Sequence, residues 1–240
     1  MIALIGGKGK DSTENKIEKR LFALVNNKRP KVLFCPYATI NKIDSSIDKF
    51  HKLIHDIDCE ITNLTLENID KFDKYLNESD ILYIAGGVSD DLVDIFIKYK
   101  LDKILAKYIN TDKIIIGSSA GAMLLTKISM GDKYMFSDNF HNYNYKMVNC
   151  LDLLHISICP HYQNEDLVVY NDEIRKYGLP SFGIEEDTAL VIDKDKIFVL
   201  KDYHGKSIYY FDNKNNHKMI PLYEGEIYEK DSMLRSWGNI

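Results

Sequence analysis

Apolar residues recur along this chain in short continuous runs that alternate with stretches of helical periodicity. The runs are rich in Ile, Val and Leu and are bounded by Gly, Pro or polar turn residues, which is typical of buried strands. The clearest runs lie at 2–5, 32–35, 61–64, 81–85, 114–116, 156–159 and 189–192. Between them, apolar residues three or four positions apart predict helices over 14–25, 43–57, 69–76, 90–99, 101–109 and 166–176. Strands that alternate with helices in this way predict a parallel sheet covered on both faces.

The C-terminal part of the chain follows a different pattern, with short apolar runs separated by polar turns. Runs at 197–200, 207–211 and 218–222 predict a tail rich in β-hairpins over about 195–240. The segment 129–147 has neither period and carries several aromatic residues, as a pocket wall, a lid or an ordered surface loop would. We therefore predict a single α/β domain over residues 1–240. It has a mostly parallel sheet flanked by helices on both faces and a β-rich C-terminal part.

Composition and charge narrow the classes of partner. The 240 residues carry a formal net charge of −5 and no basic block, which disfavours nucleic acid and membrane surfaces as partners. No apolar run approaches the length of a transmembrane helix, and the start of the chain is too short for a secretory signal. The four cysteines form no C-x-x-C pair, and Cys35 and Cys159 lie inside apolar runs, so we expect reduced thiols and a cytoplasmic location. The sequence leaves the oligomeric state open, with a homodimer among the alternatives.

The junction after the strand at 114–116 has the pattern of a nucleophile elbow. Residues 117–121 read Gly-Ser-Ser-Ala-Gly and fit G-x-S-x-G, with a buried strand before them and a helix-favouring stretch after them. Such a turn is so sharp that only glycine leaves room two residues before and two residues after the serine at its tip. The first amides of the following helix are unpaired, so they can donate hydrogen bonds to an oxyanion. The motif also occurs in ordinary loops, but this context favours Ser119 as a nucleophile.

Other candidate site residues fall at the ends of predicted strands, where parallel sheets bind their ligands. Gly86-Gly87 follows one strand, His161 follows another, and the acidic stretch 185–187 precedes a third. A glycine pair at such a junction lets backbone N–H groups approach a ligand closely. The glycine-rich segment 6–12 also follows a strand, but its spacing does not meet the phosphate-loop pattern. We interpret that segment as a mobile loop near the edge of the sheet.

A serine nucleophile needs a base, and His161 is the best-placed histidine. Its rival His155 precedes the same strand and is expected at the opposite end of the sheet. A histidine base needs an acceptor for its second N–H, and Glu186 can supply one. The resulting chain order Ser, His, Glu differs from the Ser, Asp/Glu, His order of the α/β-hydrolases, so that group does not fit.

Four segments together resemble the peptidase E family of serine peptidases, which includes cyanophycinases and has a class I glutamine-amidotransferase-like fold. The segments are Ile-Ala-Gly-Gly at 84–87, Gly-Ser-Ser-Ala-Gly-Ala at 117–122, Cys-Pro-His-Tyr at 159–162 and Gly-Ile-Glu-Glu-Asp-Thr-Ala at 183–189. They occur in the order and at the approximate spacing of the family, over roughly residues 2–200. The combination is specific, although no single segment is.

The resemblance implies a role for each matching residue. Ser119 would be the nucleophile, His161 the general base and Glu186 the third member of the triad. The backbone N–H groups of Gly87 and Ala120 would bind the oxyanion. The family resemblance implies no cofactor and no metal.

The third member of the triad has rivals within the sequence. Side chains alternate sides along an extended chain, so only one of Glu185 and Glu186 can face the site, and Asp187 is the next alternative. An aspartate of the segment 132–138, Asp132 or Asp138, would have to reach the site from elsewhere.

The expected activity is hydrolysis of a small peptide or isopeptide bond, as in dipeptidase E or cyanophycinase. Recognition of an aspartyl side chain calls for a cation, and Arg175 and Lys176 are the only cations between His161 and Gly183. Arg175 is the better candidate because its planar fork grips a carboxylate at two points, although a solvated helix end explains its charge as well. The family often has a third Gly followed by Asn-Thr where this chain has Val88-Ser89, which leaves the substrate open. The alternatives are an amidase or amidotransferase-like hydrolase acting on a non-peptide amide, and a catalytically silent binding protein on the same fold.

Overall fold

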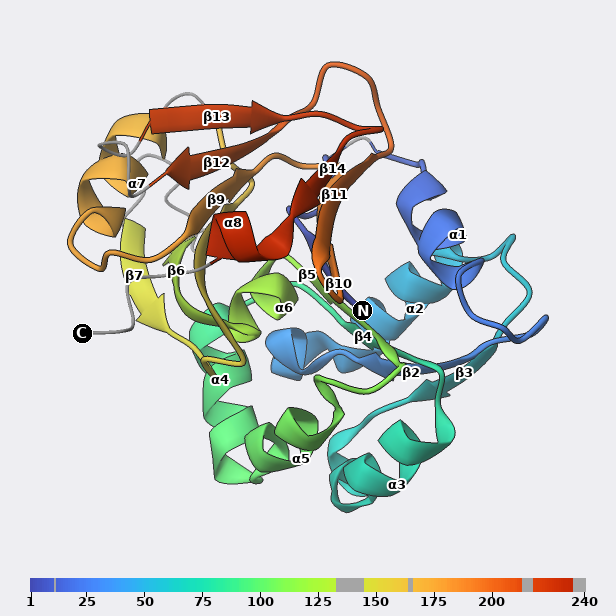
Figure 1. The fold of residues 1–240 in the computed structure, drawn as a ribbon. Coiled ribbons are helices and arrows are strands. Elements are labelled where there is room, and N and C mark those ends of the chain that lie inside the picture. Colours follow the sequence, from blue (N-terminus) through green and yellow to red (C-terminus); the bar gives the residue numbers. More distant parts are fainter. Residues whose placement is uncertain (11, 133–144, 164–165, 213–217, 235–240) are drawn as a thin grey trace.

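Parallel strands with continuous apolar sequences form the centre of the fold (Figure 1). The structure is a computed structural model and describes residues 1–10, 12–132, 145–163, 166–212 and 218–234. One sheet has eight strands in the order β14-β11-β10-β1-β5-β4-β2-β3. Its parallel strands are β1 (Ile2–Ile5), β5 (Ile114–Ser118), β4 (Ile81–Ile84), β2 (Lys31–Cys35) and β3 (Glu60–Asn63). Every residue of β1, β4 and β5 is buried, as expected of strands covered on both faces.

Helices cover both faces of this sheet. Successive side chains of each strand point to opposite faces, and the apolar ones join two separate cores. One core contains side chains of α1 (Lys16–Phe22) and α2 (Ile43–Leu53). The other contains side chains of α3 (Phe72–Glu78), α4 (Ser89–Lys98), α5 (Leu101–Tyr108) and α6 (Ala120–Leu124). The predicted mostly parallel sheet with helices on both faces is therefore confirmed.

Antiparallel strands extend this sheet beyond β1, as the β-rich C-terminal sequence indicates. They are β10 (Thr188–Asp193), β11 (Lys196–Lys201) and β14 (Ile227–Glu229). The sequence does not predict β14 or the short helix α8 (Lys230–Leu234). The exposed side chains of Ile227 and Glu229 give β14 no apolar run.

A second sheet, which the sequence pattern does not predict, packs beside the first. It has six strands in the order β13-β12-β9-β8-β6-β7. Their bounds are β6 (Thr126–Asp132), β7 (Tyr145–Asn149), β8 (Leu154–Pro160), β9 (Ser181–Ile184), β12 (Ile208–Asp212) and β13 (Lys218–Leu222). The strands β6, β8 and β9 run parallel, and the other pairs are antiparallel. Helix α7 (Asp166–Ile174) contributes Tyr170 and Ile174 to a small core with side chains of this sheet.

The prediction of an irregular segment at 129–147 is wrong at both of its ends. These ends belong to β6 and β7, while residues 133–144 lie outside the described part of the chain. Polar residues and Gly131 conceal β6, because Thr126 and Ser129 are fully buried and satisfy each other through a hydrogen bond of 2.7 Å. The Oγ of Ser129 also accepts from the N–H of Ile158 (3.2 Å). Buried polar side chains that are paired in this way break the apolar alternation without weakening the strand.

Some helices are shorter than their apolar periodicity predicts. Helix α1 ends at Phe22 and α2 at Leu53, and two 3₁₀ helices, η1 (Tyr37–Lys42) and η2 (Leu66–Lys71), precede α2 and α3. None of the helices in the described ranges is long and apolar enough to span a membrane.

Candidate active site

Ser119 stands at the tip of a strained turn between β5 and α6. Its φ of 52° and ψ of −116° lie where side-chain-bearing residues are rare. The flanking glycines give the turn its room. A Cβ on Gly117 would lie 2.3 Å from the carbonyl oxygen of Gly121, and a Cβ on Gly121 would lie 2.2 Å from that of Ile84. The turn thus has the geometry of a nucleophile elbow, with the serine held at a strand end.

His161 brings its imidazole from the second sheet to Ser119. It follows β8 directly, and its φ of 53° turns the chain out of the strand. Its Nε2 lies 2.8 Å from the Oγ of Ser119. His155, the alternative base, lies near the other end of β8, where its Nδ1 is 3.0 Å from the Oδ1 of Asp152. The structure therefore brings His161, and not His155, to the serine.

Glu186 completes a line of hydrogen bonds from the loop between β9 and β10. Its Oε1 lies 2.8 Å from the Nδ1 of His161. The neighbouring acids point elsewhere: Glu185 Oε2 accepts from the N–H of Ser207 (3.0 Å), and Asp187 Oδ1 accepts from the N–H of Gly9 (3.3 Å). The remaining rivals, the side chain of Asp132 and the whole of Asp138, lie outside the described part of the chain.

The chemistry of the three groups fixes the direction of these hydrogen bonds. An ionised carboxylate can only accept, so in the neutral imidazole the Nδ1 carries the proton and donates to Glu186. The Nε2 then offers a lone pair to the O–H of Ser119. The hydrogen bond from His161 lowers the pKa of Glu186 below its ordinary value, although partial burial acts in the opposite direction. The arrangement can therefore remove a proton from Ser119 and stabilise the imidazolium that forms.

Two backbone N–H groups near Ser119 are available to an oxyanion. Within the described ranges, neither the N–H of Gly87 nor that of Ala120 donates a hydrogen bond. Gly87 has a φ of 149° and lies so close to Ala38 that a Cβ would be 2.2 Å from its carbonyl oxygen. A Cβ on the preceding Gly86 would lie 2.9 Å from the Cβ of Ser119. The glycine pair thus lets its backbone approach the serine, as the sequence indicates.

Residues 6–9, here called the glycine loop, also contribute to the site, which the sequence pattern does not predict. This loop does not lie at the edge of the sheet, because it follows the inner strand β1 and packs against His161 and Glu186. A Cβ on Gly7, whose φ is 110°, would lie 2.2 Å from the Cε1 of His161. A Cβ on Gly9 would lie 3.3 Å from the Oε2 of Glu186. The available signal was the group of glycines after a strand, which marks close backbone approach as well as flexibility.

Three consecutive carbonyl groups at the end of β1 hold the segments of the site. They accept backbone hydrogen bonds from the three non-glycine residues with positive φ that lie in the site. The pairs are Ser119 with Ile5 (2.9 Å), His161 with Gly6 (2.8 Å) and Asp187, next to Glu186, with Gly7 (2.8 Å). The exit of β1 thus ties together segments from both sheets.

Arg175 is not brought to this arrangement. It is exposed directly after α7, and within the described residues no hydrogen bond or ion pair joins it to Ser119, His161 or Glu186. Nor do the described ranges hold a group of three or more His, Cys, Asp or Glu side chains suited to a metal ion.

A cavity of about 490 Å³ lies elsewhere on the molecule. It is lined by Lys16, Lys19, Arg20, Lys201, Asp202, Tyr203, His204 and Glu224. Ser119, His161 and Glu186 do not line it, so an acyl group bound there would not meet the serine.

Known proteins that are similar to this chain are peptidases. The model of peptidase family S51 matches residues 1–200. The "uncharacterized peptidase YgaJ" of Bacillus subtilis (strain 168) is 24% identical over 204 residues, which cover 82% of this chain and 85% of that protein. Peptidase E of Shewanella denitrificans is 23% identical over 206 residues, which cover 81% and 83%. The crystal structure of a peptidase from an acI-B1 Actinobacterium has the same fold, with a TM-score of 0.70 at 18% identity over 95% of this chain and 96% of that one. The chain therefore belongs to peptidase family S51 and is a serine-type peptidase.

Proposed function

We propose that this peptidase hydrolyses a small peptide or isopeptide bond through a triad of Ser119, His161 and Glu186. The observation that carries the proposal is the unbroken line of hydrogen bonds from Ser119 Oγ through the imidazole to Glu186, with 2.8 Å at each step. The strained elbow that presents the serine supports it.

The proposed mechanism follows from the donors and acceptors in the site. Ser119 Oγ attacks the carbonyl carbon while His161 Nε2 takes its proton, and Glu186 stabilises the imidazolium. The N–H groups of Gly87 and Ala120 donate to the oxyanion. His161 then gives the proton to the leaving amine, which breaks the C–N bond and leaves an acyl-serine. Water, deprotonated by His161, hydrolyses this ester and restores the serine.

The side-chain specificity has more than one candidate source in the chain. A role for Arg175 in binding an aspartyl carboxylate gains no support from its exposed position at the end of α7, where its charge complements the helix dipole. The proposed alternative source of specificity lies around Ser89, the first residue of α4 and two residues after Gly87, or around Tyr134, which is outside the described residues. A panel of Asp-Xaa, Asn-Xaa, Ala-Xaa and β-aspartyl dipeptides, run on the wild type and on Arg175→Ala, decides between these sources.

The cytoplasmic location remains part of the proposal and rests on the cysteines. The thiols of Cys35 and Cys159 are buried and reduced, and burial raises the pKa of Cys35 to about 12. Such unreactive thiols suit a reducing compartment.

The test of the proposed function is loss of activity in Ser119→Ala and His161→Ala. Members of a triad act as a unit, so each variant should lose a large share of a factor of about 10⁶ in kcat, while circular dichroism shows an intact fold. A fluorophosphonate probe should label the wild type at Ser119 and leave Ser119→Ala unlabelled. Near-normal turnover by Ser119→Ala would refute the proposal. Cleavage of simple amides but not of peptides would favour the amidase alternative, and a wild type that neither reacts nor cleaves would favour a silent binding protein.

A further inference from the structure

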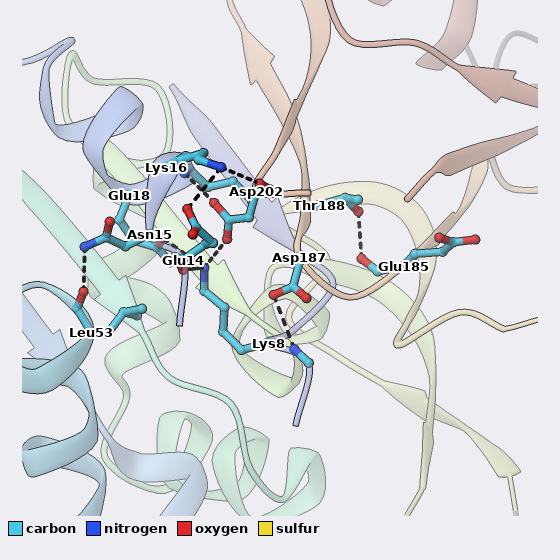
Figure 2. Close-up of polar contacts among 12 residues, drawn as sticks. Lys8, Glu14, Asn15, Lys16, Glu18, Leu53, Glu185, Asp187, Thr188 and Asp202 are labelled. Carbon is cyan, nitrogen blue, oxygen red and sulfur yellow. Dashed lines mark hydrogen bonds and ion pairs between the residues drawn. The ribbon is translucent and has the colours of Figure 1, made fainter. Parts of the chain in front are cut away.

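Three charged side chains form a cluster in the interior next to the candidate site. They are Lys8 of the glycine loop, Glu18 of α1 and Asp202, which follows β11 (Figure 2). Both carboxylate side chains are fully buried, and Lys8 is 20% exposed. The Nζ of Lys8 lies 3.0 Å from Glu18 Oε2, contacts Asp202 Oδ2, and donates to the carbonyl oxygen of Glu14 (3.0 Å). All three protons of the ammonium group therefore have acceptors.

Other elements hold the two carboxylates in place. Asp202 Oδ1 accepts from the N–H of Ile17 (2.8 Å), and Glu18 Oε1 accepts from the O–H of Tyr83 in β4 (3.3 Å). Burial alone would lower the pKa of Lys8, but the two carboxylates raise it above its ordinary value. Burial also raises the pKa of Glu18, and the opposing effect of Lys8 offsets this rise only in part. In the described part of the chain, Lys8 is thus the only cation that contacts these two carboxylates, because Lys16 reaches only the backbone carbonyl oxygen of Asp202 (3.1 Å). Its loss leaves the buried carboxylates uncompensated.

The neighbours of Lys8 face the opposite way, toward the site. Gly7 lies against the imidazole of His161, and Gly9 lies beside Glu186 and donates to Asp187. The lysine side chain thus reaches into the cluster, while the two glycines offer bare backbone to the triad. Figure 2 shows the Lys8 side chain running toward Glu18 and Asp202. Position 8 is therefore the anchor of a loop whose other side touches the proposed base and its acceptor.

The cluster and the triad are also joined through the backbone. The N–H of Asp202 donates to the carbonyl oxygen of Asp187 (3.0 Å), and the N–H of Asp187 donates to that of Gly7 (2.8 Å). A shift of the glycine loop would therefore reach Glu186 by two routes, through direct contact at Gly9 and through the Asp187 backbone.

We propose that Lys8 is a positioning residue, which holds the glycine loop against His161 and Glu186 through its ion pairs with Glu18 and Asp202. This inference rests on the proposed function, because it assigns Lys8 a role in the alignment of that triad. Lys8 itself does not touch the substrate. Without the ammonium anchor, the backbone at Gly7 and Gly9 is free to move away from the imidazole and the carboxylate.

The experiment compares Lys8→Met with Lys10→Met. Lys10 is an exposed lysine of the same segment, so its variant controls for the loss of a charge. In Lys8→Met we expect kcat to fall about 10-fold to 100-fold, the range that a misplacement approaching 1 Å produces, with KM roughly unchanged. The acidic limb of the pH profile of kcat/KM should also move to lower pH, since a loosely held Glu186 stabilises protonated His161 less. Lys10→Met should match the wild type in both measurements.

A second variant separates positioning from charge balance. Lys8→Met combined with Asp202→Asn removes one buried carboxylate together with the cation, and Asn keeps an oxygen for the N–H of Ile17. If Lys8 acts by positioning, this double variant should fold and keep the lowered kcat of Lys8→Met. The double variant also tests the inference if Lys8→Met alone does not fold. Wild-type kcat and pH profile in either folded variant, beside an active wild type, would overturn the inference and leave the triad intact. A wild type that neither cleaves nor reacts with a fluorophosphonate would instead refute the proposed function, and this inference with it.

Discussion

Gly7→Ala is a sharp test of the candidate site, because it adds one methyl group beneath the proposed base. The added Cβ would lie 2.2 Å from the Cε1 and 2.6 Å from the Nε2 of His161. Non-bonded carbon contacts favour about 3.5–4 Å, so the ring or the loop must retreat by more than about 1 Å. A displacement of that size costs about 10²-fold in rate. The φ of 110° at Gly7 adds backbone strain of about 1–3 kcal/mol to the folded state.

The assay must separate the displaced imidazole from the backbone strain. Gly225→Ala is the matched control, because Gly225 also has a positive φ, of 90°, and nothing lies within 4 Å of its Cβ position. We expect both variants to lose stability in urea unfolding, and only Gly7→Ala to lose about 10²-fold in kcat and in the rate of fluorophosphonate labelling. A folded Gly7→Ala protein with the kcat of Gly225→Ala would refute the reasoning, because His161 would then not need its position against the loop.

Further predictions concern Glu186. Glu186→Gln should lower kcat by roughly 10²- to 10⁴-fold through loss of the correct imidazole tautomer. Glu185→Gln removes a charge but keeps an oxygen for the N–H of Ser207, so it should have a small effect; the reverse order would transfer the role to Glu185. Because the pKa of Glu186 is lowered in the folded protein, its carboxylate contributes stability that is fully present above its unfolded pKa of about 4.3 and is lost as the pH falls through the lower folded value. Urea unfolding should therefore show a difference between the wild type and Glu186→Gln that is constant near neutral pH and shrinks below about pH 4, and a difference that grows on acidification would contradict this sign.

The first sheet was predictable because its strands carry their own signal. The inner strands β1, β4 and β5 are buried on both faces, so each is a continuous apolar run. The second sheet carries that signal only in some of its strands, such as β8 and β12. Its strand β6 buries Thr126 and Ser129, whose hydroxyl groups pair only once the sheet has formed. Burial of polar groups that depends on tertiary pairing cannot be read from local periodicity.

The members of the candidate triad were predictable because a hydroxyl, an imidazole and a carboxylate side chain each indicate a chemical role. Ser119, His161 and Glu186 each follow or precede a recognisable strand, and parallel topology gathers such positions. The role of the glycine loop was not predictable, because a glycine contributes space and backbone groups but no functional side chain. Its partners His161 and Glu186 lie more than a hundred residues away in the chain, so nothing near Gly7 or Gly9 reveals what they approach.

The exit of β1 explains why the site stands where the two sheets meet. Ser119 comes from the first sheet, His161 from the second, and Glu186 from the loop that passes between them. Positive φ angles at Ser119, His161 and the adjacent Asp187 cost about 1–3 kcal/mol each, and such strain persists only where the surroundings hold it. Consecutive carbonyl groups of one strand end supply that hold, by accepting a backbone hydrogen bond from each strained residue. Because these carbonyl groups belong to the last residue of β1 and the two residues that follow it, they set the relative positions of all three segments before a substrate arrives. Lys8 is the next residue after Gly7, so its ion pairs hold in place the same segment that accepts these three hydrogen bonds.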